Sequence, residues 1–288
     1  SPRQRMTLSA RVMLLLLSVK TSSSKNWGGS KLSGILSSRD NQLIKDYLKL
    51  KVNRSFRRKT GTLALEGPNL VGEALKAGLQ PDHCFFSETY FQAEGQSWLP
   101  LLPEQTKVYL LTDALFKAIA DTETPRAIAA VTPYPYPDPE AIADSLQEPL
   151  IILDQLQDPG NMGTIIRTAA AGGIANLFYT AGSVDPYSPK VLRATAGAIF
   201  RLQVSPIVDP PAFLDTLQSA GFKLIVATSA NGADYRSAAY QNPLALVIGN
   251  EAHGVSGFWR QAANQMITIP LNRGVESLNA AVAAGLLI

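Results

Sequence analysis

The sequence of 288 residues has few side chains that could form disulfide bonds or bind a transition metal. Its single cysteine, Cys84, excludes an internal disulfide and fits a reducing compartment. With that cysteine and only two histidines, His83 and His253, the chain has too few nitrogen and sulfur ligands for a zinc site. Residues 12–17 form an apolar run that is too short to span a bilayer. We therefore expect no metal centre and no membrane partner.

Two glycine-rich nucleotide-binding motifs are also absent. No G-x-G-x-x-G pattern follows the strand expected at residues 150–153, and no G-x-x-x-x-G-K-[ST] pattern occurs anywhere in the chain. These absences argue against a dinucleotide-binding oxidoreductase and against a P-loop enzyme. The common methyltransferase fold, which has a glycine-rich loop after its first strand, is disfavoured for the same reason.

Acidic residues are missing from the first 39 positions, which contain seven Lys or Arg residues. The remaining chain has 19 basic and 23 acidic residues, so the net charge of +3 hides a basic front segment. Residues 1–36 are also rich in serine, a composition that resembles a transit peptide, and we expect them to be disordered. The expected location is the cytoplasm, with an organelle as the alternative if residues 1–36 are a transit peptide.

The rest of the chain divides into two predicted domains joined by a linker. Residues 37–131 are predicted to form a small α/β domain. Its expected helices are residues 41–51, 67–77 and 113–120, and its expected strands are residues 62–65, 84–86, 108–111 and 127–131. Four alternating prolines mark residues 132–149 as a stiff linker, with a proline-rich ligand for a partner domain as the alternative.

Residues 150–288 form the second predicted domain. Continuous apolar runs indicate strands that are buried on both faces, at residues 150–153, 176–179, 224–227, 245–248 and 267–269. Helices are expected between them, at residues 162–172, 188–198, 212–220 and 258–263. The pattern predicts a doubly wound sheet with its ligand at the carboxyl ends of the strands.

A second group of basic residues lies within residues 45–59, where Tyr47 and Phe56 are interleaved with it. Such a run is most often the solvated face of a helix, but it is also the footprint expected for phosphate binding. If this segment binds RNA, the residues expected to contact it are Lys45, Lys49, Arg54, Arg57 and Arg58.

Polar residues follow the first and fourth predicted strands of the second domain. After the first strand, Asn161 is placed to cap a helix, and Arg167 lies on that helix among apolar residues. An Arg in such surroundings either extends to solvent or is held at a functional site, and the local sequence leaves both open. After the fourth strand, two glycines flank an Asn-Glu pair, which is also compatible with a structural turn alone. Glu251 is the functional candidate there, and His253 is expected to face solvent.

The last segment of the chain is a strand, a polar turn and an apolar helix. The strand ends at Pro270, the turn contains Gly274, and Ser277 is expected to cap the helix. Asn279 lies among apolar neighbours, and a buried amide must find partners because an unpaired one costs about 1–3 kcal/mol. Such a junction offers free backbone groups to a small ligand.

These segments together resemble the SpoU (TrmH) branch of the SPOUT RNA methyltransferases. Three ordered motifs carry the resemblance: Asn161, Gly163, Arg167 and Gly172; then residues 248–251 with Gly254; then Ile269, Pro270 and residues 276–279. Residues 192–201 are similar to the segment that follows the family's second strand. Residues 37–131, including residues 65–71, resemble a substrate-binding domain related to ribosomal protein L30e.

The resemblance implies a SPOUT-type parallel sheet whose C-terminal segment forms a trefoil knot. It also implies a homodimer through the methyltransferase domain and S-adenosylmethionine as the cofactor, bound in a bent shape. The chain stops at Ile288, before the family's last helix would normally finish. By position, the residues expected to line the cofactor site are Thr228, Ser229, Ala230, Asn231, Ile248, Gly249, Ile269, Leu271, Ser277, Leu278 and Asn279.

The implied reaction transfers a methyl group from S-adenosylmethionine to a ribose 2′-hydroxyl of structured RNA. The family assigns the catalytic role to the position of Arg167. Because a guanidinium stays protonated, holding a phosphate and stabilising the developing alkoxide suits it better than acting as a base. Asn161, Glu251 and Asn279 are expected to orient it. The L30e-like domain favours ribosomal RNA by analogy; the alternatives are transfer RNA and a non-catalytic RNA-binding or ribosome-assembly protein with the same fold.

Overall fold

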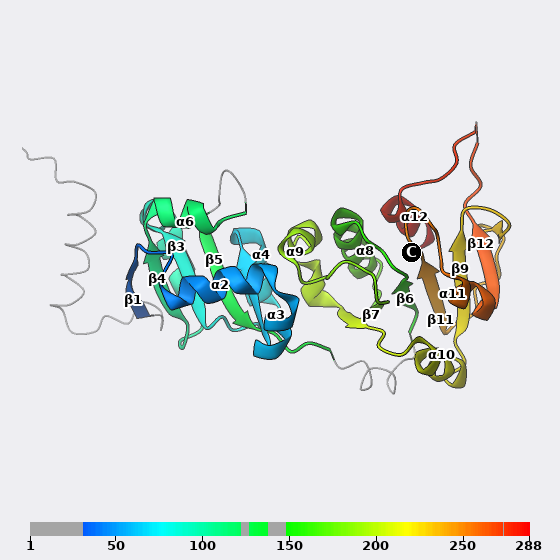
Figure 1. Ribbon diagram of the computed structural model, residues 1–288, viewed down its shortest axis with the longest axis horizontal. Helices are drawn as coiled ribbons and strands as arrows, with labels where there is room; N and C mark the ends of the chain where they lie inside the picture. Colours follow the sequence, from blue (N-terminus) through cyan, green and yellow to red (C-terminus); the bar gives the residue numbers. More distant parts are fainter. Residues whose placement is uncertain (1–30, 122–126, 138–147, 273) are drawn as a thin grey trace, which may run out of the picture.

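The computed structural model describes residues 31–121, 127–137, 148–272 and 274–288. Two α/β domains lie side by side along the long axis, and helix α9 (Pro189–Thr195) of the second domain faces the first domain (Figure 1). Residues 1–30 of the predicted extension and residues 138–147 of the predicted linker lie outside the described residues.

The first domain is built on a five-stranded mixed sheet in the order β1-β4-β3-β5-β2. Strands β1, β4 and β3 are parallel, whereas β5 is antiparallel to both β3 and β2. The strands are β1 (Lys31–Leu36), β2 (Thr62–Glu66), β3 (His83–Ser87), β4 (Lys107–Leu111) and β5 (Ile128–Pro133).

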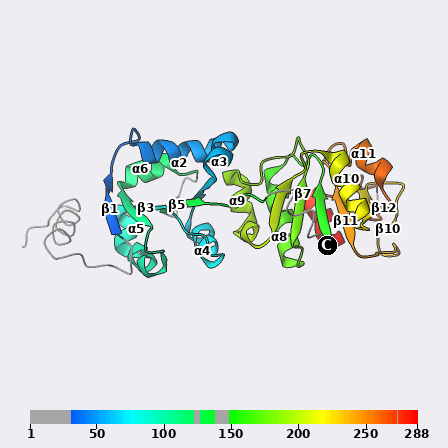
Figure 2. The same ribbon diagram turned by 90° about the horizontal axis from the view of Figure 1, so that it is seen from below.

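Helices cover both faces of this sheet (Figure 2). Helices α2 (Gln42–Val52) and α6 (Asp113–Ile119) bury Tyr47 and Phe116 against one face. Helices α4 (Pro68–Lys76) and α5 (Glu88–Ala93) bury Val71 and Phe91 against the other. Two further helices follow directly, α3 (Arg54–Thr60) after α2 and the 3-10 helix η1 (Gly95–Leu101) after α5.

The predicted limits of the extension and the linker were wrong where they meet the first domain. Residues 31–36 are not part of a disordered extension, because they form β1 and pair with β4. Residues 132–133 are not linker, because they complete β5. Helix α3 was missed since Arg57 is its one buried residue, which leaves no apolar stripe in the sequence.

The second domain contains a seven-stranded sheet in the order β10-β12-β9-β11-β6-β7-β8. Every pairing is parallel, as predicted. The strands are β6 (Leu150–Leu153), β7 (Asn176–Tyr179), β8 (Gln203–Pro206), β9 (Lys223–Thr228), β10 (Ala233–Asp234), β11 (Leu244–Ile248) and β12 (Gln265–Thr268). The helices besides α9 are α8 (Pro159–Ala171), the 3-10 helix η2 (Ala198–Arg201), α10 (Pro210–Ser219), α11 (Gly257–Ala262) and α12 (Ala280–Leu287). The five predicted strands are present, whereas β8 and β10 were missed because they are short and partly polar.

The strand order of this sheet changes direction between β6 and β11. From β6 the chain adds β7 and β8 on one side, and β11, β9 and β12 lie on the other side. The loops that leave the carboxyl ends of β6 and β11 therefore diverge, and parallel sheets bind their ligands in such a crevice. Asp154 begins the first of these loops and Gly249 begins the second. The trefoil knot that the resemblance implies stays a prediction.

Two helix N-caps differ from the prediction. Asp158, rather than Asn161, caps α8, and its carboxylate accepts a hydrogen bond from the backbone N–H of Asn161 (2.7 Å). Asn279, rather than Ser277, caps α12, and its side-chain oxygen accepts from two backbone N–H groups of the first turn. Because Asp158 takes over the capping of α8, the side chain of Asn161 is available for other contacts.

Helix α8 packs closely against its neighbours α9 and α12. A Cβ atom at Gly163 would lie only 2.3 Å from the Cβ of Ala194 on α9. A Cβ atom at Gly172, directly after α8, would lie 2.6 Å from Cγ2 of Ile288. The helix that carries Asn161 is therefore fixed on two sides.

We expect Gly163→Ala to lower the free energy of unfolding by about 1–3 kcal/mol, because the new methyl group must displace α9. Gly257→Ala is the matched control, since a Cβ atom at this first residue of α11 meets no atom within 4 Å. Urea denaturation of wild type and both variants measures the difference. Equal stability of the two variants would contradict the close packing of α8 on α9.

Candidate functional site

A cavity of about 400 Å³ lies at the carboxyl edge of the second sheet. Its wall comes from four segments: the end of β9, the loop after β11, the residues after β12, and α12 with the residues before it. This volume suits a small-molecule ligand. The cavity therefore lies at the carboxyl edge of the sheet, on the β11 side of the point where the strand order changes direction.

The loop after β11 closes tightly on itself. The backbones of Asn250 and Gly254 exchange two hydrogen bonds, of 3.0 and 2.9 Å. A Cβ atom at Gly249 would lie 2.2 Å from the backbone of Gly254, so only glycine fits there. Gly254 has a φ of +67°, a conformation that glycine adopts without strain. The two glycines that flank the Asn-Glu pair in the sequence thus shape the wall of the cavity.

Two polar residues that were not among the predicted site residues connect this loop to the end of β6. Asn250 donates through Nδ2 to the carbonyl of Gln155 (2.8 Å). The buried carboxylate of Asp154 accepts from the hydroxyl of Thr180 (2.9 Å) and from the backbone N–H of Ser256 (2.7 Å). Asp154 could have been predicted as a polar contact from the sequence, because it directly follows a buried apolar strand.

Asn161 connects the three motif segments through its side chain. Its Nδ2 donates to Oε1 of Glu251 (2.9 Å), and its Oδ1 accepts from Nδ2 of Asn279 (2.8 Å). Asn161 is 9% exposed, so both halves of its amide need a partner. Asn279 is itself exposed, contrary to the expectation of a buried amide, yet its amide is paired. Three of the four predicted catalytic residues are therefore in direct contact.

Arg167 is the fourth predicted catalytic residue and stands apart from the other three. It lies on α8 six residues after Asn161, about 9 Å further along the helix axis. Its side chain is exposed, does not line the cavity, and has no hydrogen-bond or ion-pair partner among the described residues. Its guanidinium is therefore available to an anion from outside the chain.

Most of the predicted cofactor residues line the cavity. Ala230, Asn231 and Asn279 do not; the carbonyl of Ala230 accepts from the hydroxyl of Thr228 (2.9 Å), and Asn231 has a φ of +62°, so they form a turn after β9. Glu276 belongs to the third motif but was not among the predicted cofactor residues, and it is part of the wall. The predicted residues that do line it are Thr228, Ser229, Ile248, Gly249, Ile269, Leu271, Ser277 and Leu278.

The basic cluster of the first domain is exposed except for two residues, Lys51 and Arg57. Lys45 and Lys49 lie exposed on α2, and Arg54 and Arg58 lie exposed on α3. Arg57 is 3% exposed, so the prediction that it contacts RNA was wrong. Its guanidinium donates to backbone carbonyls at the end of α2 and to a carboxylate of the second domain.

A metal site and a membrane-spanning helix are both absent from the described residues. There, no group of three or more His, Cys, Asp or Glu side chains is arranged to hold a metal ion. None of the helices in the same ranges has the length and apolar character needed to cross a membrane. His253 is exposed, as predicted.

Asn279 has two roles that substitutions can separate. We expect Asn279→Ala to lower the free energy of unfolding by about 1–3 kcal/mol, because it removes both the cap of α12 and the bond to Asn161. Asn279→Ser restores a capping oxygen but is too short to reach Asn161, so its effect is expected to be smaller. Thermal unfolding of both variants measures this. Equal losses in the two variants would contradict the capping role.

Comparisons with known proteins agree with this geometry. Residues 148–288 match the SpoU rRNA Methylase family, and residues 41–130 match the MRM3-like substrate binding domain. The Bacillus subtilis protein named 23S rRNA (guanosine(2553)-2'-O)-methyltransferase RlmP is 34% identical over 88% of this chain and 97% of its own length. The human protein named rRNA methyltransferase 3, mitochondrial, is 31% identical over 82% of this chain and 68% of its own length.

Solved structures share both domains. The SpoU methyltransferase AviRb from Streptomyces viridochromogenes, in complex with S-adenosylmethionine, has a TM-score of 0.77 at 25% identity and covers 86% of this chain and 95% of its own. The S-adenosylmethionine-bound rRNA methyltransferase from Sinorhizobium meliloti has a TM-score of 0.76 at 26% identity, over 90% and 96%. Because the chain matches the family model and is 34% identical to a relative over nearly the whole of that relative's length, it belongs to the SpoU rRNA methylase family.

Proposed function

We propose that this protein transfers a methyl group from S-adenosylmethionine to a ribose 2′-hydroxyl of ribosomal RNA. The observation that carries the proposal is the contact of Asn279, Asn161 and Glu251 beside the cavity at the carboxyl edge of the parallel sheet. The name of the Bacillus subtilis relative, a 23S rRNA 2'-O-methyltransferase, supports the reaction and the class of RNA.

The cavity has the chemistry that this cofactor needs. Ile248, Ile269 and Leu271 offer apolar surface to an adenine ring, and backbone groups after β11 and β12 offer hydrogen bonds. Among the described residues that line the cavity, Glu251 and Glu276 are the only ones with a formal charge, and carboxylates favour a cationic sulfonium. The cofactor supplies an activated methyl group, so the protein must bind it, orient the acceptor and assist loss of the hydroxyl proton.

We assign Arg167 to binding the RNA next to the ribose hydroxyl that accepts the methyl group. Its guanidinium is permanently protonated and free of partners within the described residues, so it can hold an RNA phosphate and stabilise the oxygen anion that develops on the ribose. The contacts of Asn161 hold the first turn of the same helix in place. Orientation and electrostatic stabilisation are the two contributions that this arrangement makes.

The first domain supplies the RNA-binding surface in this proposal. Lys45, Lys49, Arg54 and Arg58 are exposed on consecutive helices, and the ammonium of Lys49 lies 4.2 Å from the ring centre of Phe56. Basic side chains of this kind contact RNA phosphates. The match to the MRM3-like substrate binding domain supports ribosomal RNA over transfer RNA.

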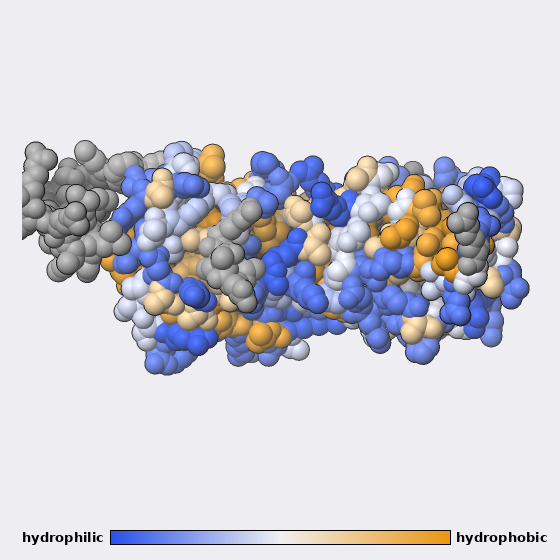
Figure 3. All heavy atoms as spheres, turned by 90° about the horizontal axis from the view of Figure 1, so that it is seen from above, coloured by the Kyte–Doolittle hydropathy of each residue, from blue (hydrophilic) through white to orange (hydrophobic). Residues whose placement is uncertain are grey.

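We propose that the active form is a homodimer through the second domain. Every residue of α12 is small or apolar, and a helix that is apolar on all sides is normally buried. Val282 and Leu286 are nevertheless 53% and 49% exposed. Figure 3 shows apolar side chains gathered on the surface of the second domain, on the side of the molecule where Figure 1 places α12. A second copy of the chain would cover this face.

We propose that the protein is located in the same compartment as the ribosome whose RNA it methylates. A bacterial type of ribosome in the cytoplasm is the first candidate, in line with the Bacillus subtilis relative. The mouse and human relatives are named as mitochondrial, which supports an organellar ribosome as the second candidate.

The proposed reaction is tested with methyl-labelled S-adenosylmethionine and undermethylated RNA, with ribosomal and transfer RNA separated after incubation. We expect label in 2′-O-methyl nucleosides of ribosomal RNA. Arg167→Ala is expected to lower the rate at least about 100-fold, because the developing charge loses its donor. Cofactor affinity should be unchanged since Arg167 does not line the cavity.

Arg260→Ala is the matched control, because Arg260 is an exposed arginine on α11. Activity of Arg167→Ala equal to that of this control would refute the assigned role. Label in transfer RNA alone would refute the substrate class. Binding of RNA without any methyl transfer in the wild type would favour the non-catalytic RNA-binding alternative.

A further inference from the structure

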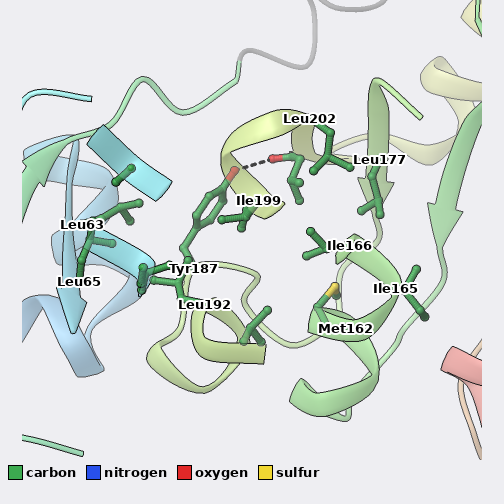
Figure 4. Packing of buried hydrophobic residues seen from close by; sticks show 14 of the residues in the cluster. Leu63, Leu65, Met162, Ile165, Ile166, Leu177, Tyr187, Leu192, Ile199 and Leu202 are labelled. Carbon is green, nitrogen blue, oxygen red and sulfur yellow. Dashed lines mark hydrogen bonds between the residues drawn. The ribbon is translucent and has the colours of Figure 1, made fainter. Parts of the chain in front are cut away.

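The two domains meet along a packed interface. Leu63 and Leu65 of β2 face Tyr187 and Leu192 of the second domain, and all four belong to one hydrophobic cluster (Figure 4). Helix α9 lies against β2, and η2 lies against α4. An apolar interface restrains the relative orientation of two domains more strongly than a linker alone.

Two ion pairs lie at the border of this interface. The carboxylate of Asp121 accepts from Nη1 of Arg193 on α9 (2.7 Å). The carboxylate of Glu73 on α4 accepts from Nη2 of Arg201 (2.5 Å). A Cβ atom at Gly197 would lie 2.4 Å from the Cβ of Glu73, so the backbone of the second domain comes directly against α4. Residues 192–201, which resemble a family segment, therefore form much of the domain contact.

A third ion pair is buried. Arg57 donates through Nη1 to the carbonyls of Leu50 and Lys51 at the end of α2, and through Nη2 to the carboxylate of Asp185 in the second domain. The side chains of Arg57 and Asp185 are 4% and 13% exposed. Asp185 also accepts from the backbone N–H of Tyr187 (3.2 Å). One guanidinium thus connects α2, α3 and the second domain.

This buried pair has a consequence for the two exposed arginines of α3. The Nη2 atoms of Arg54 and Arg58 lie 3.3 and 3.5 Å from the hydroxyl oxygen of Tyr179, which accepts both contacts. Burial raises the pKa of Tyr179, so its hydroxyl stays protonated at neutral pH. Tyr179 ends β7, and the carboxyl ends of β6, β7 and β11 lie at the same edge of the parallel sheet. The basic helix of one domain therefore reaches the edge that holds the cavity in the other.

We propose that Arg57 and Asp185 are positioning residues for RNA: their buried pair fixes α3 so that Arg54 and Arg58 bind the phosphates next to the target nucleotide. The inference rests on the proposed RNA methyltransferase function. A buried charge without its partner is strongly unfavourable, so the domains keep the paired arrangement. A basic surface that is already in place loses less entropy on binding than one carried on a freely moving domain.

Asp185→Asn removes the charge and keeps the side-chain volume. We expect the KM for ribosomal RNA to rise about tenfold, while kcat and the affinity for S-adenosylmethionine stay within about twofold. Asp215→Asn, at an exposed position of α10, is the matched control and leaves all three unchanged. Equal KM values for RNA in the two variants would overturn the proposal. Loss of S-adenosylmethionine binding in Asp185→Asn would also overturn it, because that result indicates a general structural role.

Spin labels give a second readout that does not depend on methylation. Labels on Lys117→Cys in α6 and Gln218→Cys in α10 report the distance between the domains. The native Cys84 does not take up label, because it is fully buried and burial raises the pKa of its thiol to about 12. We expect a narrow distance distribution with Asp185 in place and a broader one in Asp185→Asn.

Glu73→Gln is a second variant for the case in which Asp185→Asn does not fold. It weakens the ion pair with Arg201 at the border of the interface, and we expect a smaller broadening in the same direction. An unchanged distribution in the variants that fold would overturn the proposal. If the wild type methylates no RNA, the proposed function fails instead, and the label distances still test how the domains dock.

Discussion

The side-chain amide of Asn161 is the contact on which the rest of the site depends. An amide donates and accepts at once, and here it donates to Glu251 and accepts from Asn279. The three residues come from the start of α8, the loop after β11 and the cap of α12, so one side chain sets the relative position of three segments. Removing either partner leaves half of a buried amide unpaired, which costs about 1–3 kcal/mol.

Hydrogen bonds between other polar side chains and the backbone hold the loops next to this contact. Asp154 and Asn250 connect the ends of β6 and β11, where the strand order changes direction. The same edge of the sheet continues to Tyr179, which meets the basic helix of the first domain. The proposed cofactor cavity and the basic helix therefore lie at one edge of the sheet, and each domain supplies a different part of the proposed RNA contact.

The sequence predicts the fold well where strands are buried and apolar, as at residues 150–153 and 176–179, because few other structures suit such runs. It also predicts Asn161, Glu251 and Asn279, through the resemblance to a family. It could not predict that Arg57 is buried, because a basic residue within a basic run is expected on the surface. The carboxylate that pairs with Arg57 lies 128 positions away in the sequence. The N-cap of α8 was predicted wrongly for the same reason. Asp158 and Asn161 both suit an N-cap locally, and the distant contact between Asn161 and Glu251 decides between them.

A double-mutant cycle on Asn161 and Glu251 tests most directly whether this contact organises the cofactor site. The affinity for S-adenosylmethionine would be measured by calorimetry for wild type, Asn161→Ala, Glu251→Ala and the double variant. The contact predicts a coupling free energy of about 1–2 kcal/mol, so that the second substitution has little further effect once the first is made. Losses that simply add, with no coupling between the two positions, would contradict the account.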